Sequence, residues 1–106
     1  MFRFFTGSSV KSISVNELDG FLGKINLIDI REPYEYKGGH IPTAENIPMN
    51  LILSDPEEYL DMSKEYHIIR HSGARSSRTA AILKDKGFNV VDVTGGTGRY
   101  RGKLDR

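Results

Sequence analysis

The chain has 106 residues, a length typical of one compact domain, and its 38% apolar and 27% charged residues are typical of a folded globular protein. Its 15 Lys and Arg residues nearly balance 14 Asp and Glu residues, for a formal net charge of +1. It contains no cysteine, which excludes disulfide bonds, cysteine-based metal sites and a cysteine nucleophile; with three histidines, we expect neither a metal site nor a cofactor.

The first predicted elements are a short strand and a helix. Residues 12–15 (SISV) predict a short strand, and Asn16 is a residue type that caps helices. Gly23 would end this helix. Its expected apolar face consists of Leu18, Phe21 and Leu22.

Two further strands are predicted before residue 50. Residues 25–30 (INLIDI) are β-branched and apolar enough for a strand buried on both faces. Pro33 follows this run, and proline cannot donate to a central strand pairing. Residues 44–47 predict another short extended segment, which Pro48 closes.

The second half repeats the alternation of helix and strand. A helix is predicted to begin at Ser54 or Asp55, with Pro56 at its first position and Tyr59, Leu60 and Met62 facing inward. Strands are predicted at residues 66–69 and 90–93, and a helix at 77–86 with Gly87 as its stop. The core positions of that helix are Ala80, Ile82 and Leu83. The alternation predicts one three-layer α/β domain with a mostly parallel sheet.

The strongest chemical signal lies between the strand at 66–69 and the helix that follows it. This loop reads Arg70-His71-Ser72-Gly73-Ala74-Arg75-Ser76. Ligands of parallel sheets bind beyond the carboxyl ends of the strands, and a tight loop that opens a helix directs backbone N–H groups and a positive dipole end at an anion. Gly73 permits close backbone approach, and Arg75 offers a planar set of donors. We predict an anion-binding loop; the alternative is a plain turn with Ser76 or Ser77 as the helix cap.

Four motifs in order resemble the rhodanese (thiosulfate sulfurtransferase-like) domain. They are LIDIREPYEY at 27–36, GHIPTA with NIP at 39–48, SGARS at 72–76 and VTGG at 93–96. The resemblance covers about residues 12–102 and leaves 1–11 as an extra segment. It implies a single rhodanese-like domain over residues 1–106, with a five-stranded, mostly parallel sheet flanked by helices.

In active members of this family the loop begins with a cysteine, spaced Cys-x4-Arg from the loop arginine. That thiolate takes a sulfane sulfur from a donor, forms a persulfide and passes the sulfur to an acceptor. On this chain the resemblance places Arg75 at the loop arginine and Arg70 at the nucleophile. Arg70 stays protonated and cannot attack, so it either adds a charge to the loop or fills it.

The resemblance therefore implies a non-catalytic module that binds a small anion (thiosulfate, sulfate or phosphate) or a protein partner. The alternative is a sulfurtransferase-type enzyme that is active only with cysteine at position 70. The four residues between Arg70 and Arg75 disfavour a phosphatase, because phosphatases on related folds have five. Ser72 and Ser76 lie near His71, but no acid beside them would orient a nucleophile–base pair.

Other residues are expected to support this loop. The resemblance implies that Asp29, Arg31 and Glu32 buttress it, with ion pairing between neighbouring loops as the alternative; Glu35 is expected to be solvated. His40 in the GHIP motif is expected to hydrogen-bond and not to bind metal. The glycine-rich segment 95–98 departs from a nucleotide-binding P-loop and is interpreted as a turn into a terminal helix.

Location and macromolecular partners follow from composition. The longest apolar run, residues 80–83, is far shorter than the about 18–20 residues of a membrane helix. Phe2, Phe4 and Phe5 are expected to pack against the domain or to lie in a fraying end, with membrane contact as the alternative. Residues 66–106 hold 9 basic and 3 acidic side chains, but no nucleic-acid motif accompanies them. We expect a cytoplasmic, monomeric or weakly associating protein without nucleic-acid or membrane partners.

Overall fold

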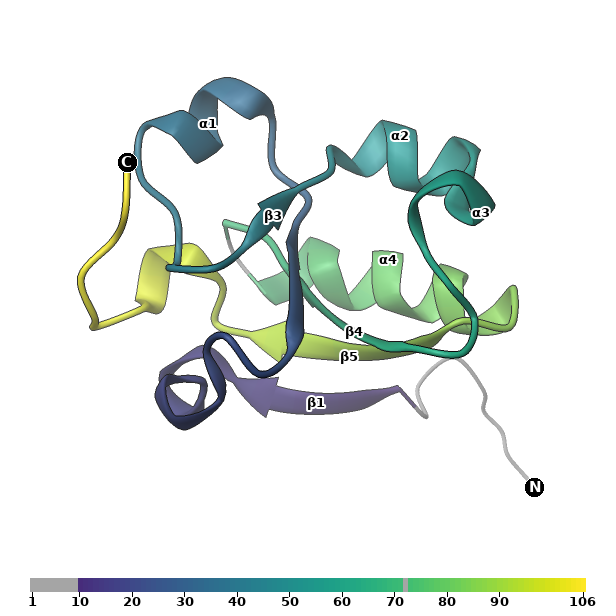
Figure 1. Ribbon diagram of the computed structural model, residues 1–106, viewed down its shortest axis with the longest axis horizontal. Helices are drawn as coiled ribbons and strands as arrows, with labels where there is room; N and C mark the ends of the chain where they lie inside the picture. The colour runs from purple at the N-terminus through teal and green to yellow at the C-terminus, as the bar shows by residue number, and fades with distance from the viewer. Residues whose placement is uncertain (1–9, 72) are drawn as a thin grey trace.

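The computed structural model describes residues 10–71 and 73–106. Its centre is a five-stranded sheet in the order β1-β5-β4-β2-β3, and every neighbouring pair is parallel (Figure 1). The strands are β1 (Lys11–Ser14), β2 (Asn26–Asp29), β3 (Glu45–Asn46), β4 (Glu65–Ile69) and β5 (Asn89–Thr94). All five coincide with predicted runs, which confirms the parallel α/β sheet.

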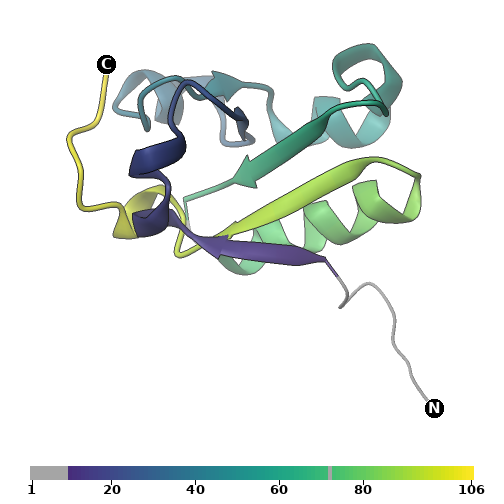
Figure 2. The same cartoon turned by 60° about the horizontal axis from the view of Figure 1, so that its bottom comes forward.

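Short helices connect the strands. The α-helices are α1 (Pro33–Lys37), α2 (Met49–Ser54), α3 (Pro56–Tyr59) and α4 (Gly73–Asp85); the 3₁₀ helices are η2 (Val15–Glu17), η3 (Asp19–Phe21) and η4 (Thr97–Arg99). Helix α4 covers one face of β4 and β5, and the segment with η2 and η3 lies on the other face (Figure 2). This arrangement confirms the three-layer architecture.

The sheet separates two apolar clusters. On the α4 side, Ala80 and Leu83 pack with Ile68 of β4 and Val90 of β5. On the other side, Leu18 packs with the strand residues Leu27, Ile69 and Val93. Burial on both faces explains why the central strands are nearly continuous apolar runs. Within residues 10–71 and 73–106, no helix is long and apolar enough to span a membrane.

The helix predicted after Asn16 is wrong. Two 3₁₀ turns replace it, and Ser14 caps the first: its hydroxyl accepts from the Asn16 N–H at 3.3 Å while Glu17 Oε1 accepts from the Ser14 N–H at 3.0 Å. Leu18 is buried as predicted, but Phe21 is 48% exposed. Two glycines, Gly20 and Gly23, disfavour a longer helix here.

The other helices agree with prediction only in part. The single turn α3 begins at Pro56 as predicted and buries Leu60, but it leaves Tyr59 and Met62 exposed because one turn presents few inward positions. Helix α4 starts at Gly73 rather than at residue 77, and Ile82 is only partly buried. Helices α1 and α2 were not predicted, because five or six residues carry too little periodicity.

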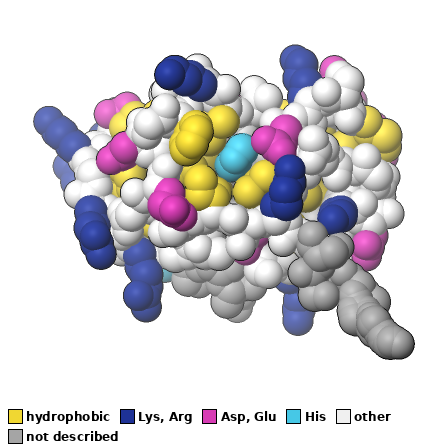
Figure 3. Space-filling view, turned by 90° about the horizontal axis from the view of Figure 1, so that it is seen from below, with side chains coloured by type: hydrophobic (Ala, Val, Ile, Leu, Met, Phe, Trp, Pro, Cys, Tyr) yellow, Lys and Arg dark blue, Asp and Glu magenta, His cyan; other side chains and the backbone are white. Residues whose placement is uncertain are grey.

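One strand position carries a buried histidine. His67 of β4, with 8% of its surface exposed, pairs in register with Leu27 on one side and Val91 on the other, and Val91 pairs with Lys11. Seen from below, hydrophobic side chains gather around a histidine on this face of the molecule, with acidic and basic side chains nearby (Figure 3). Burial lowers the pKa of His67 below the usual value, so its neutral form is favoured.

Candidate functional site

The predicted anion-binding loop leaves the carboxyl end of β4 and enters α4. Arg70 and His71 are described with their side chains, whereas Ser72 lies outside the described residues. Gly73, Ala74 and Arg75 form the first turn of α4, where only their backbone is described. Arg70 and His71 thus follow the carboxyl end of a parallel strand, the side of such a sheet where ligands bind.

Backbone hydrogen bonds hold the start of this loop against the glycine-rich segment after β5. The Thr97 N–H donates to the Arg70 carbonyl at 2.7 Å, and the Gly98 N–H donates to the His71 carbonyl at 3.0 Å. Gly96 makes this approach possible: its φ is +66°, and a Cβ there would lie 2.4 Å from the Arg70 oxygen. Only glycine, which has no Cβ, fits between these two segments at position 96.

The role of residues 96–98 was missed at the sequence level. The interpretation as a turn into a terminal helix is correct for η4, but it omitted the contact with the loop. The VTGG motif carried the signal, since a glycine pair after a strand is typical of close backbone approach. Its partner lies on another strand, so spacing along the chain did not identify it.

Arg70 brings an unsatisfied charged donor to the position where the resemblance places the nucleophile. Its Nε atom is buried and has no hydrogen-bond partner in the part of the chain that the structure describes. A guanidinium stays charged at ordinary pH, and a buried donor without a partner costs about 1–3 kcal/mol. An acceptor placed here would therefore be stabilised.

A cavity of about 440 Å³ lies beside the loop, and we call it the Arg31–His71 cavity. Arg31, Tyr34 and Glu35 line it from the β2–α1 side, and His71, Gly98 and Tyr100 line it from the other. It thus brings together two predicted site residues, Arg31 and His71. Glu32 and His40 do not line it.

A buried ion pair fixes one wall of this cavity. Arg31 Nε and Nη2 donate to Asp29 Oδ1 at 3.0 Å and Oδ2 at 2.8 Å, and Nη2 also donates to the Gly39 carbonyl at 2.7 Å. Asp29 is fully buried, and Arg31 is 6% exposed. The pair lies within one β–α connection, not between two loops. Removing one partner of such a pair typically costs about 3–5 kcal/mol.

The remaining predicted residues hold local structure. The His40 ring stacks on Tyr36 at 3.7 Å between ring centroids, and its Nδ1 lies 2.9 Å from the Tyr36 carbonyl. Burial, aided by Asp29, raises the pKa of Tyr36, whose hydroxyl donates to the Ala44 carbonyl. The exposed Glu32 is the N-terminal cap of α1, and its N–H donates to Glu35 Oε1 at 3.0 Å. Among the described side chains, no cluster of three or more potential metal ligands exists.

Comparisons with known proteins agree with this architecture. The family model described as "Rhodanese-like domain" matches residues 14–103. Two relatives come from Bacillus subtilis. The chain is 35% identical to the "Putative sulfur carrier protein YrkF", in a match that covers 92% of this chain and 55% of YrkF. It is 40% identical to the "Putative sulfurtransferase YtwF", in a match that covers 76% of this chain and 77% of YtwF. The chain therefore spans only about half of the YrkF protein.

A solved structure is similar to this chain in both sequence and fold. SSP1007 from Staphylococcus saprophyticus has a TM-score of 0.80 and 34% identity, and the match covers 92% of this chain and all of that one. The parallel sheet order, the loop after β4 and the matched residues lead to one conclusion: the chain belongs to the rhodanese-like domain family.

Proposed function

We propose that this chain is a non-catalytic rhodanese-like module whose loop at residues 70–75 binds a small oxyanion such as thiosulfate, sulfate or phosphate. The observation that carries the proposal is Arg70, which stands at the nucleophile position with its Nε buried and unpartnered in a chain without cysteine. A persulfide needs a sulfur nucleophile, which no side chain here supplies. The cytoplasmic location expected from the sequence is part of the same proposal.

Three features support binding of an anion. Helix α4, with 13 residues, directs its positive end and its free N–H groups at the loop. Arg70 adds a guanidinium whose unmet Nε donor an oxyanion would satisfy. The hydrogen bonds from Thr97 and Gly98 hold the first loop residues in place, so less conformational entropy is lost on binding.

Titration with thiosulfate, sulfate and phosphate tests the proposal, with the amide NMR signals of residues 71–76 as the readout. We expect these signals to shift at millimolar anion. The variant Arg70→Gln should weaken binding roughly tenfold, because it removes a charge-assisted contact. Lys86→Gln is the matched control, since Lys86 is an exposed cation that follows the far end of α4.

Sulfur transfer from thiosulfate to cyanide tests the absence of catalysis. We expect no turnover above the enzyme-free rate by the unmodified chain and measurable turnover by Arg70→Cys, which restores the missing thiol. Turnover by the unmodified chain would contradict a non-catalytic module. Activity of the variant alone would favour a loop that has kept the geometry for sulfur transfer.

A protein partner is the second candidate. Tyr34 is 75% exposed and Leu104 is 36% exposed, and both line the Arg31–His71 cavity. Exposed aromatic and aliphatic side chains at the rim of a cavity are typical of protein contacts. Unchanged amide signals at millimolar anion would contradict oxyanion binding and favour this second candidate.

A further inference from the structure

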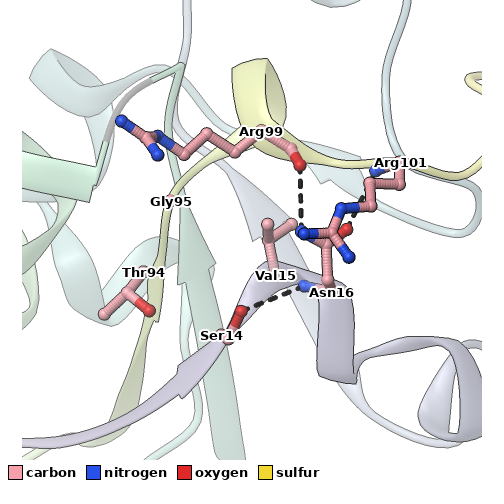
Figure 4. A pocket seen from close by; sticks show the side chains of 7 residues that line it. All are labelled: Ser14, Val15, Asn16, Thr94, Gly95, Arg99 and Arg101. Carbon is pink, nitrogen blue, oxygen red and sulfur yellow. Dashed lines mark hydrogen bonds between the residues drawn. The ribbon is translucent and has the colours of Figure 1, made fainter.

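A second pocket lies on the other side of the glycine-rich segment. It has a volume of about 390 Å³, and we call it the β1–β5 pocket because the carboxyl ends of these neighbouring strands form its base. Its lining residues are Ser14, Val15, Asn16, Thr94, Gly95, Arg99 and Arg101 (Figure 4). Gly95 lines this pocket, whereas Gly96 contacts the loop carbonyls, so the two sites share one short wall.

The ionisable side chains that line this pocket are all positively charged. Arg99 and Arg101 are its two ionisable lining residues, and neither has a carboxylate within salt-bridge distance among the described side chains. The Glu17 carboxylate accepts from the Ser14 N–H and does not line the pocket. Figure 4 shows the guanidinium groups of Arg99 and Arg101 on opposite sides of Val15. Such a site attracts an anion and repels a cation.

A single side chain fixes the segment that carries both arginines. Asn16 Nδ2 donates to the Arg99 carbonyl at 3.0 Å, and Asn16 Oδ1 accepts from the Arg101 N–H at 2.9 Å (Figure 4). Between them, Tyr100 donates its hydroxyl to Asp19 Oδ1 at 2.8 Å. The walls of the pocket are thus held before any ligand arrives, which lowers the entropy lost on binding.

The stem of Arg99 is also packed. A Cβ at Gly95 would lie 3.5 Å from Arg99 Cβ and 3.3 Å from Val15 Cγ1, so the glycine lets both side chains approach the backbone. Val15 is 1% exposed and gives the pocket an apolar floor. The hydroxyl groups of Ser14 and Thr94 add polar groups at the edge.

We propose that the β1–β5 pocket binds a small phosphate monoester, with Arg99 and Arg101 holding the phosphate and the exposed Thr94 at the edge contacting the organic part. Guanidinium groups match phosphate oxygens in geometry and charge. The volume lies in the range of about 300–1,000 Å³ that is typical of small-molecule sites, so it accommodates more than a bare phosphate. This site is separate from the loop at residues 70–75.

Amide NMR titration with glycerol 3-phosphate tests this site, with inorganic phosphate and glycerol as comparison probes. We expect glycerol 3-phosphate to shift the signals of residues 14–16, 94–95, 99 and 101, phosphate to do so more weakly, and glycerol not at all. Arg99→Gln and Arg101→Gln should each weaken binding about tenfold. Both substitutions keep the hydrogen bonds of the Asn16 side chain, because these bonds reach only the backbone atoms of Arg99 and Arg101.

Four results would overturn the assignment. Signals of these residues that stay unchanged at millimolar ester would exclude the site, and shifts confined to residues 71–76 would exclude it while supporting the loop. Equal or tighter binding of inorganic phosphate would exclude an ester as the ligand. Lys86→Gln removes one exposed cation from the connection between α4 and β5, near the amino ends of the strands, and should leave the affinity unchanged. An equal loss of affinity there would show non-specific attraction.

Discussion

Gly96 has a backbone conformation and a contact that both require glycine. Its φ of +66° and ψ of −178° are strained for residues with a side chain, and its neighbours are the carbonyl groups of Arg70 and His71. The residue therefore controls how closely the segment after β5 approaches the loop. The consequence reaches the proposed anion site, because Thr97 and Gly98 hold the loop through the two hydrogen bonds that follow.

The substitution Gly96→Ala should lower the free energy of unfolding by at least about 2 kcal/mol, since the new methyl group would overlap the Arg70 oxygen. Urea unfolding followed by circular dichroism measures this change. Gly20→Ala is the matched control, because a Cβ at Gly20 meets nothing within 4 Å; we expect a change within about 0.5 kcal/mol. Equal effects of the two substitutions would contradict the role assigned to Gly96.

Single residues differed in how far the sequence predicted them. Arg70 was identified as the residue at the nucleophile position, because the SGARS motif fixes its register. The Asn16 contacts with Arg99 and Arg101 were not predicted, because they join segments that are far apart in the chain. A side-chain amide that bonds to a distant backbone leaves no periodic signal, so only the folded arrangement of β1 and β5 shows it.

At the scale of elements, strands were predicted well and short helices poorly. The runs 25–30 and 66–69 are rich in β-branched residues and bounded by polar or turn residues, so burial on both faces is readable from them. The segment after β1 contains Leu18, Phe21 and Leu22 at helical spacing, yet it forms η2 and η3. The spacing of apolar residues did not predict this conformation, because a 3₁₀ turn directs other positions toward the core than an α-helix does.

Alanine substitutions at Leu18 and Phe21 distinguish these two conformations. Leu18 is fully buried, so Leu18→Ala should lower the free energy of unfolding by about 2–5 kcal/mol. Phe21 is 48% exposed, so Phe21→Ala should lower it by less than about 1 kcal/mol. Urea unfolding gives both values. Losses of similar, large size would contradict the 3₁₀ geometry and favour an amphipathic α-helix with both residues inside.

For the whole molecule, the sheet order determines where polar groups become buried. The order β1-β5-β4-β2-β3 places β4 inside the sheet, so His67 lies in a row with Leu27, Val91 and Lys11. Its Nδ1 is buried and has no hydrogen-bond partner in the described structure. Neighbouring Lys11 and Glu65 pair with each other at 3.0 Å at the edge of this row. Pairing order depends on contacts between segments far apart in the chain, so the sequence predicted the strand at 66–69 but not the strand neighbours of His67.

This arrangement predicts a pH-dependent stability. Burial lowers the pKa of His67 in the folded state, so the unfolded chain binds more protons as the pH falls through about 6.5. The free energy of unfolding should therefore be highest above that pH and decrease between pH 7.5 and 5.5, by no more than about 1.4 kcal/mol from this group. Chemical unfolding at several pH values measures the slope.

The comparison variant is His67→Leu, which removes the titrating group and the unpartnered nitrogen. We expect it to flatten the slope between pH 7.5 and 5.5 and to leave the contributions of other groups unchanged. It should also raise stability at pH 5.5, because a buried polar atom without a partner is lost. An unchanged slope in this variant would assign the pH dependence to other residues.

The antiparallel bridge between His40 and Asp105 has a practical consequence for labelling this protein. Two backbone hydrogen bonds, of 2.9 and 2.8 Å, hold Asp105 beside His40, and Arg106 Nε donates to the Gly38 carbonyl at 3.2 Å. Gly38 lines the Arg31–His71 cavity. A fluorophore or fusion partner attached after Arg106 therefore starts at the rim of that cavity and would report on, or obstruct, its occupant. The exposed Lys11 at the start of β1 lies at the opposite end of the sheet (Figure 1), so a label on this residue keeps both proposed sites accessible for immobilised binding measurements.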